Sequence, residues 1–94
     1  MPVRFVWDAA KASANRRKHG IDFVEATTAF DDPLSITVPD PVHSVGEERL
    51  LLVGGTALGR LVVVAHTDEG AQIRIISARA ATRRERKTYE EANA

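Results

Sequence analysis

The stretch QIRIISARAATRRERKTY, residues 72–89, contains the transition from strand to helix around which the rest of the chain is arranged. Its first part carries three isoleucines and predicts extended structure over residues 72–77. Thr82 and Glu85 then have the spacing of a capping box, in which each side chain satisfies a free amide at the start of a helix. We therefore expect a strand, a sharp turn and a helix over residues 82–92.

The same stretch is strongly basic. Its cations are Arg74, Arg79, Arg83, Arg84, Arg86 and Lys87, and its single acid is Glu85. A strand that feeds a basic helix at a corner would hold several guanidinium groups near one patch of surface. Guanidinium groups bind phosphate through paired hydrogen bonds, so a polyanion is the expected ligand, with RNA as the leading candidate.

Size and composition restrict the class of protein. The chain has 94 residues, which is too short to close two independent cores, so one domain over residues 1–94 is expected. With 44% hydrophobic and 28% charged residues it has the composition of a globular protein. It has no cysteine, and its apolar runs are too short to cross a bilayer. The N-terminus lacks the apolar core of a signal peptide, so we expect a soluble, cytoplasmic protein without membrane contact.

The net charge of zero conceals an asymmetry between the two halves of the chain. Residues 1–48 have a net charge of −3, and residues 49–94 have a net charge of +3. This division fits a protein that meets a nucleic acid on one surface and another partner elsewhere. Two solvated faces of opposite sign would give the same numbers.

The N-terminal third predicts a short edge strand over residues 3–7 followed by two helices. Asp8 is a plausible N-cap for a helix over residues 9–19, and Gly20 suits the left-handed position that ends it. The second helix is expected to start at Asp22, with Glu25 in a variant capping arrangement. Its buried stripe is Phe23, Ala26, Thr27 and Phe30, and Asp31-Asp32-Pro33 ends it.

From residue 34 onward the pattern is extended. Strands are predicted over residues 34–38, 49–53, 60–65 and 72–77, separated by short glycine-containing or polar turns. Short turns between consecutive strands predict an antiparallel meander, and the two N-terminal helices can cover its apolar face. The fold class is therefore α+β. The last helix has Tyr89 as its only large apolar residue, so it should pack lightly or pack on a partner.

Several kinds of chemistry have no support in the sequence. The three histidines lie in separate elements, no carboxylates stand at ligand spacing on one helix, and no nucleotide-binding or hydrolase motif occurs. We therefore expect neither a metal nor a cofactor. Metal-free RNA cleavage needs only groups that orient the 2′-hydroxyl, neutralise the phosphorane and protonate the 5′-oxygen. Arginine and histidine side chains can perform these tasks.

Three candidate site residues fit this chemistry. Arg60 begins a predicted strand after a glycine turn, and is either a phosphate clamp or a solvated arginine at a strand end. Arg79 closes the strand before the last helix, where the basic cluster converges. Tyr89 either stacks on a base or orients a phosphate, or it simply docks the last helix.

Other polar residues have structural explanations that compete with a functional one. Lys18 and His19 lie in the last turn of the first helix, where cations complement the helix dipole. His43 is a loop residue, and His66 is expected at a strand end. Residues 48–49 are a Glu-Arg pair that could form a local or cross-strand contact.

Taken together, three segments resemble the BrnT family of toxins, which belong to the wider RelE-like group of small ribonuclease toxins. They are FVWDAAKASANRRKHGIDFVEA at residues 5–26, ERLLLVGGTALGRLVVVAHT at 48–67 and IRIISARAATRRERKTYEE at 73–91. The first and last contain unusual strings, W-D-x-x-K-x-x-x-N-x-x-K-H-G and R-I-I-S-A-R-x-A-x-x-x-E-R-x-x-Y. The middle segment is mostly a β-hairpin pattern.

The resemblance implies an α/β arrangement with helices on one face of an antiparallel, RelE-like sheet. It also implies a toxin that degrades RNA and halts translation, and that a co-encoded BrnA-type antitoxin neutralises. Such antitoxins carry a DNA-binding segment, so contact with DNA is expected only through the antitoxin. Two toxins and two antitoxins would form the complex.

The resemblance also suggests roles for individual residues. RelE-like toxins generally use an arginine after a strand turn, an arginine at the end of the last strand and a C-terminal tyrosine, which match Arg60, Arg79 and Tyr89 here. With His19 these are the expected catalytic residues. The expected RNA-binding residues are Lys18, Arg49, Arg74 and Arg83. RelE-like enzymes often carry more lysines on the sheet, so the general base stays open between His19, Tyr89 and a water held by Glu48.

The leading hypothesis is therefore a metal-independent endoribonuclease toxin. One alternative is a module that binds RNA or DNA without cutting it. Another is an interaction protein whose basic face docks an acidic segment of a partner.

Overall fold

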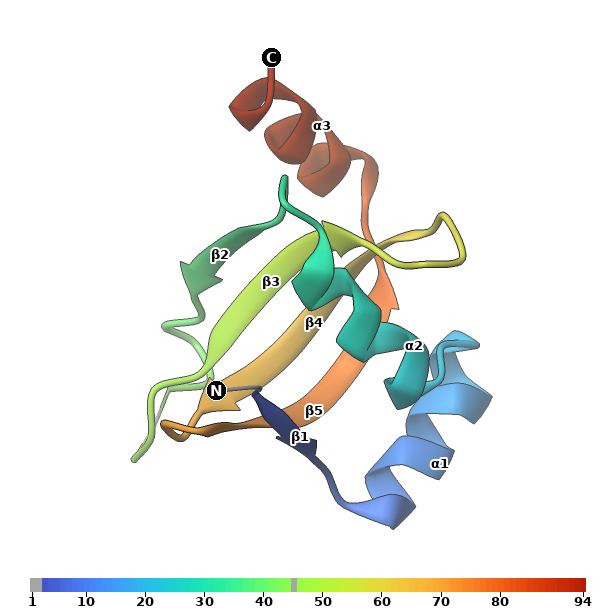
Figure 1. Ribbon diagram of the computed structural model, residues 1–94, viewed down its shortest axis with the longest axis vertical. Helices are drawn as coiled ribbons and strands as arrows, with labels where there is room; N and C mark the ends of the chain where they lie inside the picture. The colour runs from blue at the N-terminus through green and yellow to red at the C-terminus, as the bar shows by residue number, and fades with distance from the viewer. Residues whose placement is uncertain (1–2, 45) are drawn as a thin grey trace.

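The computed structural model describes residues 3–44 and 46–94, and within them five strands form one sheet. In sheet order they are β1 (Arg4–Val6), β5 (Gln72–Ala80), β4 (Leu61–Asp68), β3 (Leu50–Gly55) and β2 (Ile36–Pro39). The helices are α1 (Ala9–His19), α2 (Phe23–Thr28), the 3₁₀ turn η1 (Ala29–Asp31) and α3 (Arg83–Ala92). Figure 1 shows α1 and α2 on one face of the sheet and α3 standing beyond one end of it.

The α+β class is confirmed, but the prediction of a wholly antiparallel sheet is wrong at one edge. Strands β2 to β5 are antiparallel neighbours in chain order, whereas β1 pairs with β5 in parallel, with Phe5 opposite Ile73. The position of α1 explains this direction. Because α1 follows β1 after two residues and packs on β5, β1 has to run toward the end of β5 that α1 covers. The sheet is therefore mixed.

The predicted bounds of α1 are confirmed at both ends. The Asp8 carboxylate accepts a hydrogen bond from the Lys11 amide at 3.0 Å. Gly20 has a φ of 70° and donates its amide to the Arg16 carbonyl at 2.9 Å. At this left-handed position a side chain would be strained, so the glycine of the K-H-G string has a structural role.

The capping of the other two helices was predicted with mixed success. In α3 both arms of the Thr82–Glu85 capping box are formed. In α2 the Asp22 carboxylate accepts from the Val24 amide, but Glu25 takes no part in the cap. The Glu25 side chain turns instead toward the β3–β4 turn, where it has stronger partners.

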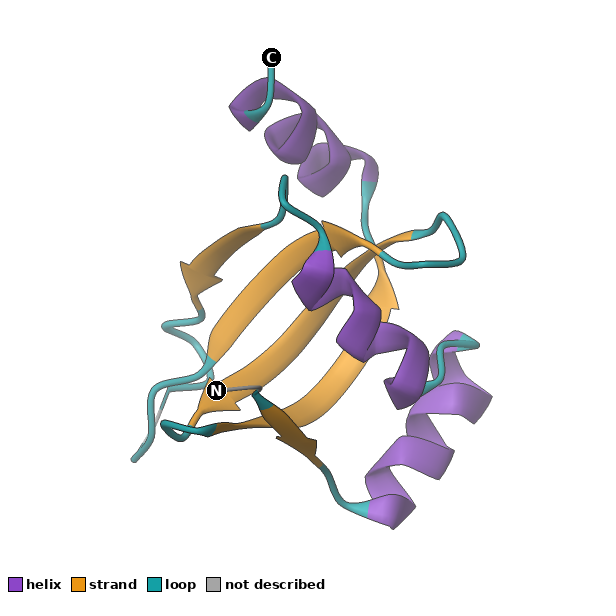
Figure 2. Ribbon diagram, in the orientation of Figure 1, coloured by secondary structure: helices purple, strands orange, loops and turns teal. Residues whose placement is uncertain are grey.

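The main core lies between the two N-terminal helices and the sheet, as Figure 2 shows. It consists of Ile21, Phe23, Ala26, Ala29, Leu52, Val62, Val64, Ile75 and Ala78. Trp7 packs edge-on against Phe23, with 5.9 Å between ring centroids. In the predicted stripe Phe23 and Ala26 are fully buried, whereas Thr27 and Phe30 are only half-buried. The chain tightens into η1 at Ala29, and Phe30 packs at the margin of the core, with its ring centroid 5.1 Å from that of Phe5.

Beyond the end of β1, the free edge of β5 is closed by a side chain. The Asn15 amide of α1 donates to the Ala78 carbonyl at 2.9 Å and accepts from the Ala78 N–H at 3.0 Å. It also donates to the Ile21 carbonyl at 3.0 Å. Asn15 therefore takes the place of a strand residue and satisfies backbone groups that β1 is too short to reach.

The opposite face of the sheet, which we call the second face, carries a smaller apolar cluster. Val53, Leu61 and Val63 are buried there, and Ala81 and Tyr89 pack against them. None of the residues of α3 is fully buried, so the prediction of a lightly packed last helix is confirmed.

Strands β3, β4 and β5 are longer than predicted, whereas β1 and β2 are shorter than the predicted ranges 3–7 and 34–38. Arg79 lies inside β5, and β4 continues to Asp68. A register irregularity at Ala65/His66 lets β5 accommodate one extra residue, so pairing extends past it. His66 is therefore inside a strand and only 4% exposed, with its ring edge-on to Phe30. In the described part of the chain no helix is both long and apolar enough to cross a membrane.

Candidate active site

Arg60 lies in the turn before β4 and is held by a buried carboxylate. Its guanidinium forms two hydrogen bonds with Glu25 of α2, one of them from Nε at 2.8 Å, and Nη2 also donates to the Gly20 carbonyl at 3.1 Å. The Glu25 side chain is 7% exposed and accepts a further bond from the Thr56 hydroxyl at 2.8 Å. Hydrogen bonds from Arg60, which outweigh the effect of burial, lower the pKa of Glu25.

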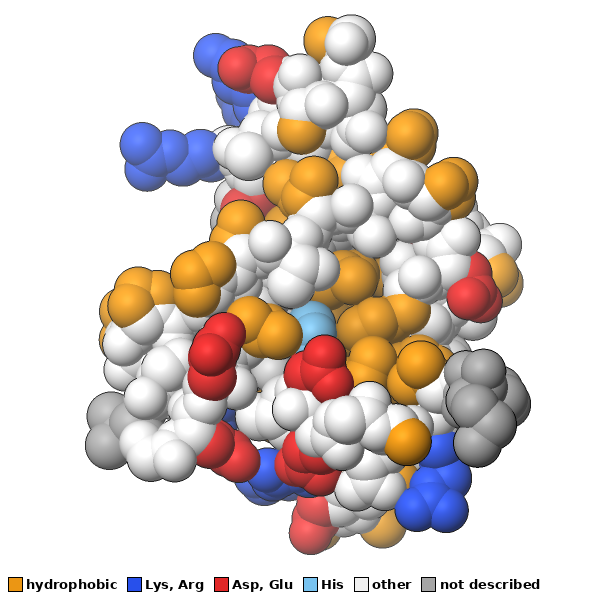
Figure 3. Space-filling view, turned by 60° about the vertical axis from the view of Figure 1, so that its left-hand side comes forward, with side chains coloured by type: hydrophobic (Ala, Val, Ile, Leu, Met, Phe, Trp, Pro, Cys, Tyr) orange, Lys and Arg blue, Asp and Glu red, His pale blue; other side chains and the backbone are white. Residues whose placement is uncertain are grey.

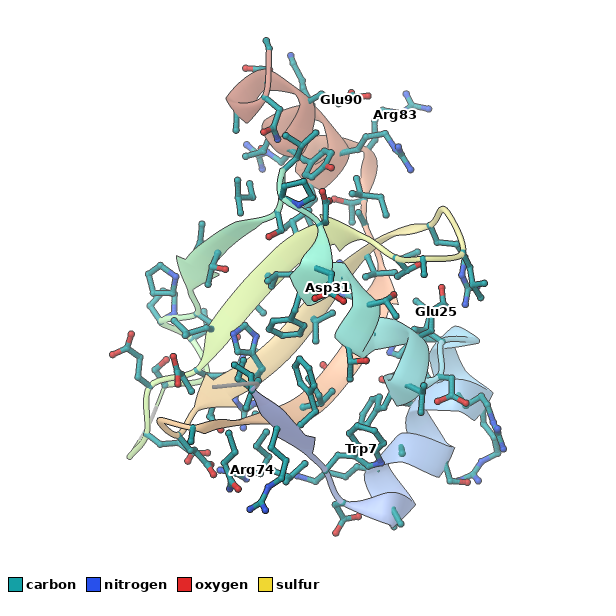
Figure 4. The ribbon with its side chains drawn as sticks, viewed as in Figure 1. Trp7, Glu25, Asp31, Arg74, Arg83 and Glu90 are labelled. Atoms are coloured by element: carbon teal, nitrogen blue, oxygen red, sulfur yellow. The ribbon has the colours of Figure 1, made fainter. Side chains whose placement is uncertain are left out.

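This arrangement fixes the direction of the Arg60 side chain. Nε and Nη2 are occupied, whereas no hydrogen bond to another described residue uses Nη1. Figure 4 shows Glu25 at the edge of α2 that faces the β3–β4 turn. Arg60 is therefore both a structural tie between α2 and this turn and a pre-oriented cation with one open nitrogen.

Arg79 has a similar geometry on the other side of the sheet. Nη1 and Nη2 donate to the two Glu85 oxygens at 2.7 Å and 2.8 Å, which is a fork-to-fork pair. The same carboxylate accepts from the Thr82 amide at 2.8 Å as part of the capping box. The Arg79 side chain is 38% exposed, so the capping box of α3 presents this guanidinium at the surface.

The paired Glu85 carboxylate gives a pH-dependent stability. Hydrogen bonds from Arg79 are the largest cause that lowers the pKa of Glu85, from 4.5 to about 2. Because the folded-state pKa is lower, the stabilisation is complete above pH 4.5 and is lost as the pH falls toward 2.

We expect wild-type protein to lose about 2 kcal/mol more of its free energy of unfolding than Glu85→Gln when the pH falls from 5 to 2. Glutamine keeps a capping-box side chain at this position but does not titrate. Urea unfolding of both proteins across this range would measure the difference. Parallel pH profiles would show that the Arg79–Glu85 pair does not stabilise the fold.

Tyr89 ties α3 to the end of η1. Its hydroxyl donates to Asp32 Oδ2 at 2.7 Å, and the same oxygen accepts from the Gly55 amide at 2.8 Å. Burial alone would raise the pKa of Asp32, but the hydrogen bonds from Gly55 and Tyr89 outweigh it and lower the pKa. The bond to Asp32 in turn raises the pKa of Tyr89, so the phenol keeps its proton at neutral pH.

An open hollow at the end of the sheet lies between the Arg60–Glu25 cluster and the Tyr89–Asp32 pair. It is lined by Thr28, Asp31, Asp32, Gly55, Thr56, Ala57 and Tyr89. Thr56 belongs to the Arg60–Glu25 cluster, and Asp32 holds Tyr89. The end of β3 therefore joins the surroundings of Arg60 to those of Tyr89.

The structure brings Arg60, Arg79 and Tyr89 to one end of the sheet but does not gather them on one face. Arg60 contacts α2, on the side of Val62 and the main core, whereas Arg79 is opposite Val63, which belongs to the second face. Arg60 and Arg79 therefore lie on opposite faces of this end. Of the cations expected to converge within residues 72–89, Arg79 and Arg83 share one corner, whereas Arg74 lies near the other end of β5 (Figure 4). Successive residues of a strand point to opposite faces of the sheet. Arg79 is opposite Val63, which is three residues after Arg60, so the two arginines point to different faces.

The other predicted RNA-binding residues are dispersed. Arg74 lies near the opposite end of β5 from Arg79 and pairs with Glu47 at 2.8 Å and Glu69 at 2.9 Å. Arg49 precedes β3, and its Nε is buried without a hydrogen-bond partner among the described residues. Lys18 is exposed at the end of α1, and Arg83 is exposed at the start of α3. Figure 4 shows Arg74 and Arg83 at opposite ends of the molecule.

The histidines differ in their access to a ligand. His66 is buried in the core, where burial lowers its pKa and keeps the ring neutral. His43 is exposed and its Nδ1 lies 2.9 Å from Asp40. His19 is exposed in the last turn of α1, next to the Gly20 carbonyl that accepts from Arg60.

Three carboxylates that sequence reasoning did not assign to the site hold its candidate residues: Glu25, Asp32 and Glu85. The capping-box spacing located Glu85 but did not indicate that its carboxylate also pairs with Arg79. Glu25 was assigned to the wrong partner, and Asp32 was considered only as a helix-ending residue. In the described part of the chain, no group of three His, Asp or Glu side chains has a geometry that could hold a metal ion.

The chain is similar to proteins of one known family. A family model described as "Ribonuclease toxin, BrnT, of type II toxin-antitoxin system" matches residues 7–85. The crystal structure of the Brucella abortus ribonuclease toxin BrnT is similar, with a TM-score of 0.67 and 23% sequence identity over 86% of this chain and 99% of that one. A search of curated proteins finds no match. The family match covers most of the chain, so this protein belongs to the BrnT family of ribonuclease toxins of type II toxin–antitoxin systems.

Proposed function

We propose that this BrnT-family toxin is a metal-independent endoribonuclease that inhibits translation and growth. The observation that carries the proposal is the partly exposed Arg79 guanidinium at the end of β5, which Glu85 holds through Nη1 and Nη2 and whose Nε forms no hydrogen bond with another described residue. A planar guanidinium held in this way suits a phosphate that gains charge during reaction. Tyr89, whose raised pKa keeps the phenol protonated, lies on the same α3 helix.

The reaction follows from the chemistry of RNA. The 2′-oxygen attacks the adjacent phosphorus and gives its proton to a base, and the bond from phosphorus to the 5′-oxygen breaks as that oxygen takes up a proton. The products are a 2′,3′-cyclic phosphate and a 5′-hydroxyl. Arg79 neutralises the phosphorane and Tyr89 orients or protonates it. The base stays unassigned: Tyr89 keeps its proton because its pKa is raised, and His19 lies beside the Gly20–Arg60 contact on the other face. Glu48 adjoins Glu47, which pairs with Arg74 at the opposite end of β5.

The remaining basic residues take secondary positions in this proposal. Arg60 offers its open Nη1 to a phosphate on the other face of the sheet end. Arg74 and Arg79 are five residues apart on β5, about 16 Å along an extended strand. An RNA strand running along β5 would reach both of them. Arg83 lies at the continuation of this path beyond Arg79, and Lys18 and Arg49 contact RNA outside it.

A type II toxin implies an antitoxin partner, and we propose a BrnA-type antitoxin in a complex of two toxins and two antitoxins. DNA is then contacted through the antitoxin, and the toxin acts in the cytoplasm as a single RelE-like domain. An apolar groove on the second face supports antitoxin docking. It is lined by Ile36, Val38, Leu51, Val53, Val63, Glu85 and Thr88, so an antitoxin seated there would cover the surroundings of Arg79.

The test is incubation of purified protein with end-labelled RNA in EDTA, followed by analysis of the new ends. We expect fragments with 2′,3′-cyclic phosphate and 5′-hydroxyl ends, and loss of cleavage when the co-encoded antitoxin is added. If the RNA stays intact but is retarded in a gel, with an affinity that falls steeply with salt, the protein is a binding module and not an enzyme. If naked RNA stays intact, a translation extract tests cleavage on the ribosome, and intact RNA in both would refute the proposal.

A further inference from the structure

The charges of α3 are arranged against its own helix dipole. Arg83 and Arg84 are in its first turn, and Glu90 and Glu91 are in its last. The N-terminal end of a helix carries a partial positive charge, so cations there and acids at the other end destabilise it. The one acid of the first turn, Glu85, points to Arg79 and closes the capping box.

Helix α1 shows the opposite arrangement and serves as an internal comparison. Its cations Arg16, Arg17 and Lys18 are in the last turn, where they complement the dipole. Helix stability therefore accounts for the cations of α1, but it does not account for those of α3.

The cations of α3 also lack partners within the chain. No hydrogen bond or ion pair joins the side chains of Arg83, Arg84 and Arg86 to any other described residue, and Lys87 has only a 3.9 Å contact with Glu91. At 100° per residue these four project from one side of the helix, while Glu85, Thr88 and Tyr89 occupy the side that faces the sheet. Glu90 and Glu91 project from the same side as the cations but at the far end of α3, so the positive charge gathers at the end nearest Arg79. Figure 3 shows Lys and Arg side chains projecting from the α3 end of the molecule, away from its body.

The position of this basic face relative to Arg79 indicates what it binds. The chain reaches Arg83 four residues after Arg79, so the two lie at the same corner of the sheet. The capping box already satisfies the amides of Thr82 and Glu85, so the guanidinium groups are the main donors that this corner offers to an anion. Arginine forks match phosphate geometry, and a strand whose scissile phosphate is at Arg79 carries further phosphates on either side.

We propose that Arg83, Arg84 and Arg86 bind the phosphates of the substrate RNA that flank the scissile one. This inference rests on the proposed function and extends it to the size of the substrate. The toxin then favours long RNA over a dinucleotide, because only a longer strand reaches α3. The charge arrangement of α3 lowers helix stability in exchange for this electrostatic contact.

The test compares two triple variants with equal loss of charge, Arg83→Gln/Arg84→Gln/Arg86→Gln and the control Lys11→Gln/Arg16→Gln/Arg17→Gln. Binding is measured with 2′-O-methyl RNA of about 20 nucleotides, which cannot be cleaved through the 2′-oxygen. For the α3 variant we expect affinity at low salt to fall on the order of 10-fold to 100-fold. The slope of log K against log salt should decrease by about 2, as expected when three cations no longer contact a single strand.

Stability and substrate length distinguish this role from a structural one. Glutamine forms helices well, so the α3 variant should unfold at the same or a higher urea concentration than wild type while binding RNA more weakly. The α1 control should be slightly less stable yet bind RNA normally. Cleavage of the long RNA by the α3 variant should show a raised KM, whereas cleavage of a dinucleotide should be unchanged.

Other outcomes would overturn the inference. An unchanged salt slope would show that α3 does not contact RNA. Equal losses on long and short substrates would place these arginines at the scissile phosphate. Normal RNA binding together with weakened antitoxin binding would make the basic face a surface for an acidic protein. If the wild type cleaves no RNA, the proposed function fails. The salt slope of 2′-O-methyl RNA binding still shows whether the arginines of α3 contact RNA.

Discussion

Replacing Arg79 with alanine is expected to lower the rate of RNA cleavage by 10²-fold or more, the order of magnitude that follows removal of one transition-state donor. Arg79 is a partly exposed cation at the end of β5, and the Glu85 carboxylate fixes its orientation through Nη1 and Nη2. The rate should be measured under single-turnover conditions, with growth arrest at equal expression as the cellular readout. Arg79→Lys should retain part of the activity, because lysine keeps the charge and loses the fork.

The matched control is Arg16→Ala on α1. Arg16 is also exposed and also faces an acid, Asp22, at 3.7 Å. Its helix packs on the main-core face of the sheet, opposite the face that carries Arg79, so the variant should cleave RNA like wild type. Full activity of Arg79→Ala beside this control would remove Arg79 from the active site.

The variant Arg60→Ala would test the site less directly, because Arg60 also has a structural role. Its partner Glu25 is a buried carboxylate, and Arg60→Ala would leave that charge without its cation. A loss of activity would therefore combine any role in catalysis with a loosened β3–β4 turn. This ambiguity is smaller for Arg79, because Glu85 is partly exposed and keeps its backbone partner at Thr82.

The largest expected effect on stability is that of Asn15→Ala, about 3 kcal/mol in the free energy of unfolding. The change removes three hydrogen bonds and leaves the N–H and carbonyl of Ala78 and the carbonyl of Ile21 without partners in a buried place. Each buried polar group left unsatisfied costs about 1–3 kcal/mol, and access of water reduces the total. Urea unfolding followed by circular dichroism would measure the loss.

Ser13→Ala is the control for this prediction. Ser13 is exposed on the same helix, and its hydroxyl only accepts a bond from Arg17. Its replacement should change the free energy by less than about 0.5 kcal/mol. If the two variants were equally stable, Asn15 would not be what closes the edge of β5.

Much of the local structure was predictable from the sequence because it depends on neighbours in the chain. Asp8 and Gly20 delimit α1, and Thr82 with Glu85 starts α3, because each of these caps is completed within four residues. Apolar runs with short turns likewise predicted β3, β4 and β5 as consecutive antiparallel strands. The resemblance of the W-D…K-H-G and R-I-I-S-A-R strings to the BrnT family was also confirmed by the family match.

Tertiary structure alone decided how the polar residues are partnered. The parallel direction of β1 depends on where α1 packs, and the Asn15 bonds join residues 63 positions apart. Glu25 meets Arg60 across 35 residues, a pairing that outweighs the local cap expected with Asp22. Strand alternation, once the register was set, placed Arg60 and Arg79 on opposite faces of one sheet end. A one-dimensional pattern records which residues are basic, but their faces and partners depend on the register and packing of distant segments.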